Sequence, residues 1–155
     1  MTAFLRSPRL HLALRLLLGA VFVYASLDKI WEPAAFAKIV YQWQVVGPVP
    51  SNLVAVTLPW IELVAGLLLI AGVWKRESAL VVALMLVIFI VAAGSVMARG
   101  IDVENCGCVS VATAGPPSDW PPAWTTGVGW FLVTRNLVFL GAALALVFVT
   151  PRRPA

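Results

Sequence analysis

Four long runs of apolar residues constrain this chain more than any other feature of its sequence. They cover about residues 10–27, 53–74, 79–98 and 128–149. A helix that crosses the hydrocarbon core of a bilayer needs about 20 mostly apolar residues, so each run is long enough to cross once. Only 12% of the 155 residues are charged, whereas a soluble domain has about 25%. The sequence therefore predicts an all-α membrane protein, a four-transmembrane-helix bundle that forms a single domain over residues 1–155.

The distribution of basic residues predicts the orientation of the bundle. Four spans place both termini on one side, and cytoplasmic loops carry an excess of Lys and Arg. The terminal side carries Arg6, Arg9, Lys75, Arg76, Arg152 and Arg153, and the other side carries Lys29, Lys38 and Arg99. We therefore expect a multi-pass protein of the inner (cytoplasmic) membrane with cytoplasmic termini. The net charge of +4 does not indicate nucleic-acid binding, because the basic residues form no patch.

The first span has an alternative interpretation. Arg6 and Arg9 precede an apolar run that ends near the small residue Ala25, which is the pattern of a secretory signal with a cleavage site. We favour a retained first helix and keep the cleaved signal as the alternative.

Two outer loops, residues 28–52 and 99–127, connect the spans on the extracytoplasmic side. Apolar residues recur at intervals of three and four within residues 34–46, which predicts an amphipathic helix along the membrane surface; they are Phe36, Ile39, Val40, Trp43 and Val46. Gly47 and Pro48 should end this helix. The second loop is rich in Gly and Pro, so no long helix is expected there.

The two cysteines of the chain, Cys106 and Cys108, are separated by a single glycine in the second outer loop. Disulfides persist outside the cytoplasm, but a bridge across so short a spacing is strained and restrains almost no chain. A strained bridge is labile and oxidising, so this CxC pair favours thiol-disulfide exchange. A purely structural pair is the alternative. A closed zinc site is disfavoured because it needs four ligands and the single histidine, His11, lies near the opposite side.

Two opposite charges lie inside the spans at similar depths. Glu62 lies about 13 Å and Arg135 about 10 Å below the outer starts of their helices, at 1.5 Å per residue. Because a lone charge in the bilayer turns toward a partner, we predict a Glu62–Arg135 pair, with hydrogen bonds from Asn136 and Asn105. The pair would either fix helix register or form a proton or quinone site beneath the CxC loop.

Several other residues within the spans have structural interpretations. The long side chain of Arg15 should reach the cytoplasmic headgroups, and Pro59 should kink the second span. Close helix contact is expected at four glycines, namely Gly66, Gly72, Gly94 and Gly141.

The chain resembles the MauE branch of the DoxX-like membrane proteins, the methylamine-utilisation protein E family. The matching features are Arg15 with Leu18-Gly19, Lys29, Phe36, Tyr41, the stretch LPWIEL at 58–63, Arg99-Gly100, Cys106-Gly107-Cys108 and Arg135-Asn136. The resemblance implies a four-helix membrane protein that works with a thioredoxin-like extracytoplasmic partner in disulfide formation. It implies a redox role for Cys106 and Cys108, supported by Glu62, Arg135 and Asn136. Many members follow the CGC motif with Phe-Gly, where this chain has Val109-Ser110.

Together these features predict a thiol-disulfide oxidoreductase. Since the chain has no further cysteine, electrons must pass to a second partner or to a quinone, for which we expect an aromatic pocket near Trp60, Trp130 and Phe131. Two alternatives remain open. The protein could be a non-catalytic membrane scaffold for a thioredoxin-like partner, or a small proton-coupled transporter that uses Glu62.

Overall fold

The computed structural model describes residues 7–101, 103 and 128–149, and within these it contains five helices. Four are long and apolar enough to cross a membrane. They are α2 (Pro8–Trp31), α4 (Pro48–Ala71), α5 (Lys75–Ala98) and α7 (Trp130–Phe148). The shorter α3 (Pro33–Gln42) lies between the first two. This confirms the all-α fold and the four predicted spans.

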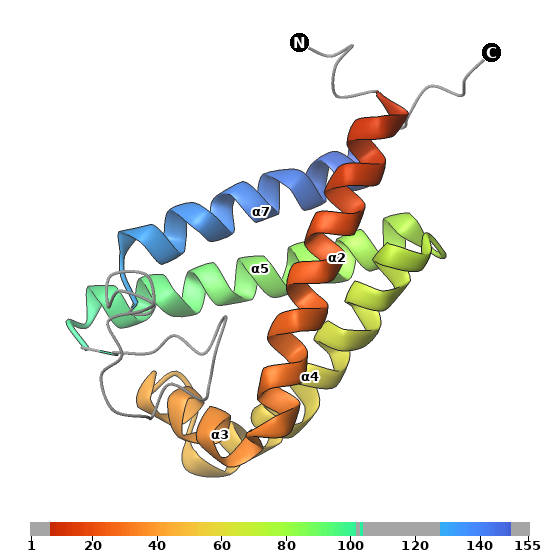
Figure 1. Cartoon of the computed structure of the whole chain (residues 1–155). Coiled ribbons are helices and arrows are strands. Elements are labelled where there is room, and N and C mark those ends of the chain that lie inside the picture. The colour runs from red at the N-terminus through yellow and green to blue at the C-terminus, as the bar shows by residue number, and fades with distance from the viewer. Residues whose placement is uncertain (1–6, 102, 104–127, 150–155) are drawn as a thin grey trace, which may run out of the picture.

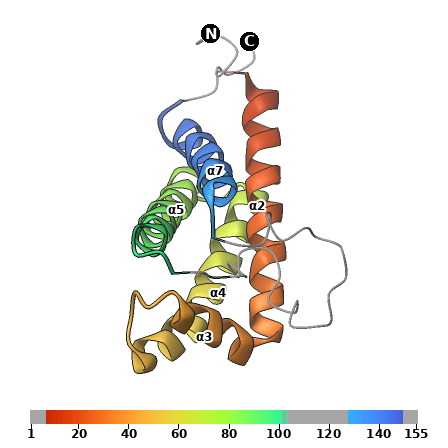
Figure 2. The ribbon, with the colours of Figure 1, turned by 90° about the vertical axis from the view of Figure 1, so that its left-hand side faces the viewer.

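The four long helices form two pairs (Figure 1). α2 packs mainly against α4, and α5 packs mainly against α7. The pairs lie closest together at the turn end, which we define as the end where α4 turns into α5 through Gly72–Trp74. They diverge toward the opposite end, where α3 packs against α4; we call this the α3 end. Figure 2 shows the same separation of the two pairs from another side.

Two glycines set the close approach of α2 and α4. A Cβ at Gly19 would lie 2.6 Å from Ile70 Cγ1 and 2.8 Å from the Gly66 carbonyl oxygen. A Cβ at Gly66 would in turn lie 3.0 Å from the Gly19 carbonyl oxygen. The helix contact predicted at Gly66 is therefore confirmed. Within the described part of the chain, no atom outside the local helix backbone lies within 4 Å of the same position at Gly94 or Gly141, so the helix contact predicted there was wrong.

Arg15 has a partner within the protein that the sequence did not predict. Its Nη2 donates to the Ile70 carbonyl oxygen at 3.2 Å, near the C-terminus of α4. Side chains in a helix lean toward its N-terminus, and this direction brings Arg15 to the end of the antiparallel α4. Gly72 ends α4 with φ +76°, and a side chain there would also collide with the Arg15 guanidinium. The arginine thus binds one of the carbonyls that a helix C-terminus leaves unpaired.

The helix α3 is shorter than predicted, since it ends at Gln42 instead of Val46. Gln44 has φ +50°, a left-handed conformation that the helix cannot continue through. Its apolar face is nevertheless as expected, with Phe36, Ile39 and Trp43 buried. Arg99, which follows α5, donates to the carbonyl oxygens of Trp43 at 2.8 Å and Gln44 at 2.9 Å. The end of α3 is thereby bound to the end of α5, across the opening between the two helix pairs.

Candidate functional site

A buried ion pair joins α2 to α4 near the α3 end. Lys29 Nζ donates to both carboxylate oxygens of Glu62, at 2.8 Å to Oε1 and 2.6 Å to Oε2. The two side chains are only 6% and 11% exposed. The Lys29 ammonium also lies 5.2 Å from the ring centre of Phe36, within the range of a cation–π contact. The charge of each residue is thus compensated inside the protein.

The antiparallel arrangement of α2 and α4 explains why these two side chains meet. Because side chains lean toward the N-terminus of their helix, Lys29 points from the end of α2 back into the bundle, and Glu62 points toward the α3 end. Lys29 follows the buried residues Phe22 and Ser26 at helical spacing. This spacing places Lys29 on the core face of its helix. The same spacing in the sequence could have identified Lys29 as the partner of Glu62. The helix also runs on to Trp31 instead of ending at Leu27.

The predicted Glu62–Arg135 pair was wrong. Among the described residues Arg135 forms no ion pair with Glu62, and its Nε is buried without a hydrogen-bond acceptor. The reason is lateral position: similar depth does not bring two side chains together when α4 and α7 belong to different helix pairs. Asn136 uses its Nδ2 to donate to the Leu132 carbonyl oxygen at 2.7 Å, within its own helix.

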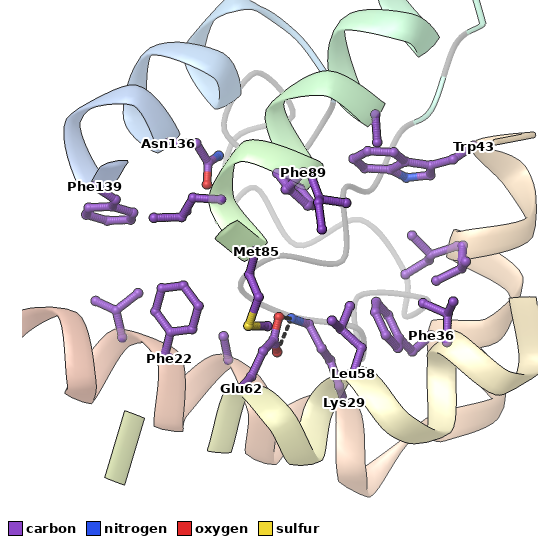
Figure 3. A pocket seen from close by; sticks show the side chains of 18 of the residues that line it. Phe22, Lys29, Phe36, Trp43, Leu58, Glu62, Met85, Phe89, Asn136 and Phe139 are labelled. Atoms are coloured by element: carbon purple, nitrogen blue, oxygen red, sulfur yellow. Dashed lines mark hydrogen bonds and ion pairs between the residues drawn. The ribbon is translucent and has the colours of Figure 1, made fainter. Parts of the chain in front are cut away.

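Glu62, Arg135 and Asn136 do line one cavity, together with Lys29. The cavity has a volume of about 650 Å³ and lies between the diverging helix pairs, with walls from all five helices. Figure 3 shows Lys29 and Glu62 on one side of it and Asn136 on the other. Its remaining lining is mostly apolar, and six aromatic side chains contribute: Phe22, Tyr24, Phe36, Trp43, Phe89 and Phe139. The arrangement suits an apolar molecule that carries a few polar atoms.

The aromatic pocket predicted near Trp60, Trp130 and Phe131 does not coincide with this cavity. None of the three lines it, and all three side chains are exposed on the surface of the bundle. Exposed Trp residues are typical of helices that face lipid and its interface. The aromatic residues of the cavity come instead from α2, α3, α5 and α7. Trp43 and Phe89 are in contact there, with ring centres 5.0 Å apart.

Cys106 and Cys108, like Asn105, lie outside the described residues. The structure does describe residues on either side of the segment that contains them. Val128 N donates to the Val103 carbonyl oxygen at 3.1 Å, and Val103 is buried in one apolar cluster with Phe36, Ile39 and Trp43. These three residues also line the cavity. The described residues on either side of the cysteine segment, Val103 and Val128, therefore pack beside the cavity.

The fold and the cavity define a multi-pass helical membrane protein with a buried ion pair beside a largely apolar cavity. The family model "Methylamine utilisation protein MauE" matches residues 7–149, and this chain belongs to that family. It is 30% identical over 151 residues to the methylamine utilization protein MauE of Paracoccus denitrificans, which covers 97% of this chain and 75% of the relative. The MauE of Paracoccus versutus is 28% identical over 147 residues, covering 95% of this chain and 73% of the relative. No solved structure matches the chain.

Proposed function

We propose that this protein is a membrane-bound thiol-disulfide exchange protein that supports the redox maturation of extracytoplasmic proteins. The observation that carries the proposal is the CxC pair, which contains both cysteines of the chain. Membership of the MauE family supports a role in the membrane, and the names of the relatives connect them with methylamine utilisation. We place the α3 end and the CxC segment outside the cytoplasm and both termini inside it, as the distribution of Lys and Arg favours.

The chemistry is an exchange between the dithiol of one protein and the disulfide of the other. A thiolate attacks one sulfur of a disulfide and forms a mixed disulfide, and the second thiol of the attacking pair then resolves it. Two electrons and two protons pass from one pair to the other, so the reaction balances without another reactant. The partner we propose is a thioredoxin-like protein on the extracytoplasmic side.

The experiment that tests the exchange is trapping in cells with the single variants Cys106→Ser and Cys108→Ser. Removal of the resolving thiol should leave a mixed disulfide, seen as a reductant-sensitive mass increase on non-reducing gels. The matched control is the double variant, which cannot form one. No trapped species from either single variant, together with normal partner maturation in the double variant, would show that the protein is a scaffold.

A proton-coupled transporter based on Glu62 receives less support. Both carboxylate oxygens of Glu62 accept hydrogen bonds from Lys29, and the space beside them is lined mostly by apolar side chains.

A further inference from the structure

The cavity offers hydrogen-bond donors that have no acceptor. Trp43 Nε1 and Arg135 Nε are both buried and have no acceptor among the residues that the structure describes, and both residues line the cavity. A lysine ammonium has three donors, and Lys29 directs its two hydrogen bonds to Glu62. A buried donor that lacks an acceptor costs about 1–3 kcal/mol. The site is therefore short of acceptor oxygens, which a bound molecule would supply.

The position of the cavity indicates that this molecule enters from the lipid. Tyr24 in α2 and Ile88 in α5 both line the cavity, and both are exposed at the surface of the bundle. These two helices belong to different pairs, so the cavity reaches the surface where the pairs diverge. An apolar body with carbonyl oxygens could pass there without leaving the bilayer. The volume of the cavity, about 650 Å³, also lies within the 300–1,000 Å³ that is usual for small-molecule sites.

We propose that this cavity binds a lipid-soluble quinone, which accepts electrons from the CxC dithiol. This inference rests on the proposed function. The two thiols lose two electrons and two protons and form one S–S bond, while the two carbonyl oxygens of the quinone become the hydroxyls of a quinol. Because the chain has only two cysteines, it has no further thiol pair to receive the electrons, which must pass to another molecule; we assign that role to the quinone.

The binding test uses the double variant Cys106→Ser/Cys108→Ser, so that its result does not depend on thiol chemistry. The protein is placed in phosphatidylcholine nanodiscs, and retention of a decyl-substituted benzoquinone is measured against empty nanodiscs. We expect one quinone per protein. Leu58→Trp, which fills the cavity, should weaken binding at least tenfold, whereas Leu53→Trp, at an exposed position of the same helix, should not change it. Trp43→Phe keeps an aromatic side chain but removes the indole N–H donor, and should weaken binding about fivefold.

Anionic lipid headgroups are the other source of acceptor oxygens, since Arg135 adds a positive charge that no described residue neutralises. Nanodiscs that contain phosphatidylglycerol distinguish the two sources. If this lipid displaces the quinone at equal concentration, or if Leu58→Trp and Leu53→Trp behave alike, the quinone site is refuted.

A second measurement tests the electron transfer. Reduced protein with both cysteines is mixed with the quinone without oxygen, and free thiols and quinol are counted. Loss of two thiols per quinol formed is the expected result. Quinone that binds but leaves the thiols reduced would overturn the acceptor role. Failure to trap a mixed disulfide, by contrast, would count against the proposed function and leave the binding result intact.

Discussion

The turn end and the α3 end of the bundle contain the same four long helices but are packed in opposite ways. At the turn end, all four helices contribute to one cluster of Leu, Val, Ala and a single Phe, and α2 meets α4 at two glycines. Toward the α3 end the helix pairs diverge, aromatic residues replace small aliphatic ones, and a cavity of about 650 Å³ remains between them. Small residues bring helices together in lipid, so close helix contact holds the dense end together, whereas the open end contains the candidate site.

The open end is held in place by polar interactions. The Lys29–Glu62 pair joins α2 to α4, and Arg99 binds the end of α3 from the end of α5. Such interactions keep their geometry only if all partners are present, because a buried charge without its partner is costly. The comparison therefore predicts that loss of a polar group destabilises the open end, whereas added side-chain volume destabilises the dense end.

The largest effect should follow from breaking the ion pair. Lys29→Met leaves the Glu62 carboxylate buried without its partner, and should lower the free energy of unfolding by about 3–5 kcal/mol. Unfolding in mixed micelles with a rising fraction of dodecyl sulfate, followed by circular dichroism, measures this change.

The double variant Lys29→Met/Glu62→Met is the control, because it removes both charges and leaves a well-filled apolar contact. It should recover most of the stability lost by the single variant. A single variant as stable as the original protein would show that the pair does not hold the open end together.

The sequence predicted the fold well because the bilayer imposes a length and a composition on every span. The predicted helix boundaries were less accurate where a charged or polar side chain has its partner inside the protein. The prediction for α2 stopped at Leu27, since Asp28 and Lys29 are charged, yet the helix continues to Trp31. The site was predicted only in part. Glu62, Arg135 and Asn136 do line one cavity, but which residue pairs with Glu62 depends on the lateral packing of helices, which depth along a span does not encode.

At the dense end, Gly19→Ala should have the next largest effect. The new Cβ would lie 2.8 Å from the Gly66 carbonyl oxygen, and this backbone atom cannot move without separating α2 from α4. Overpacking of this kind costs about 1–3 kcal/mol. Gly66→Ala, whose Cβ would lie 3.0 Å from its nearest atoms, should cost less than Gly19→Ala in the same unfolding experiment. If both variants keep the original stability, the two glycines do not determine how closely these helices approach.

The smallest effect, and one of opposite sign, is expected for Gly94→Ala and Gly141→Ala. Both glycines lie inside helices and are exposed, and no described atom beyond the local helix backbone lies within 4 Å of a new Cβ. Alanine is favoured over glycine in a helix by about 0.5–1 kcal/mol, because it loses less conformational freedom on folding. Each variant should therefore raise the unfolding midpoint slightly. Unfolding by dodecyl sulfate in mixed micelles, as for Gly19→Ala, measures this change. A loss of stability at either position would mean that a further surface packs there, such as a second copy of the chain. The contrast between Gly19 and Gly94 thus separates glycines needed for helix contact from glycines that the helix merely tolerates.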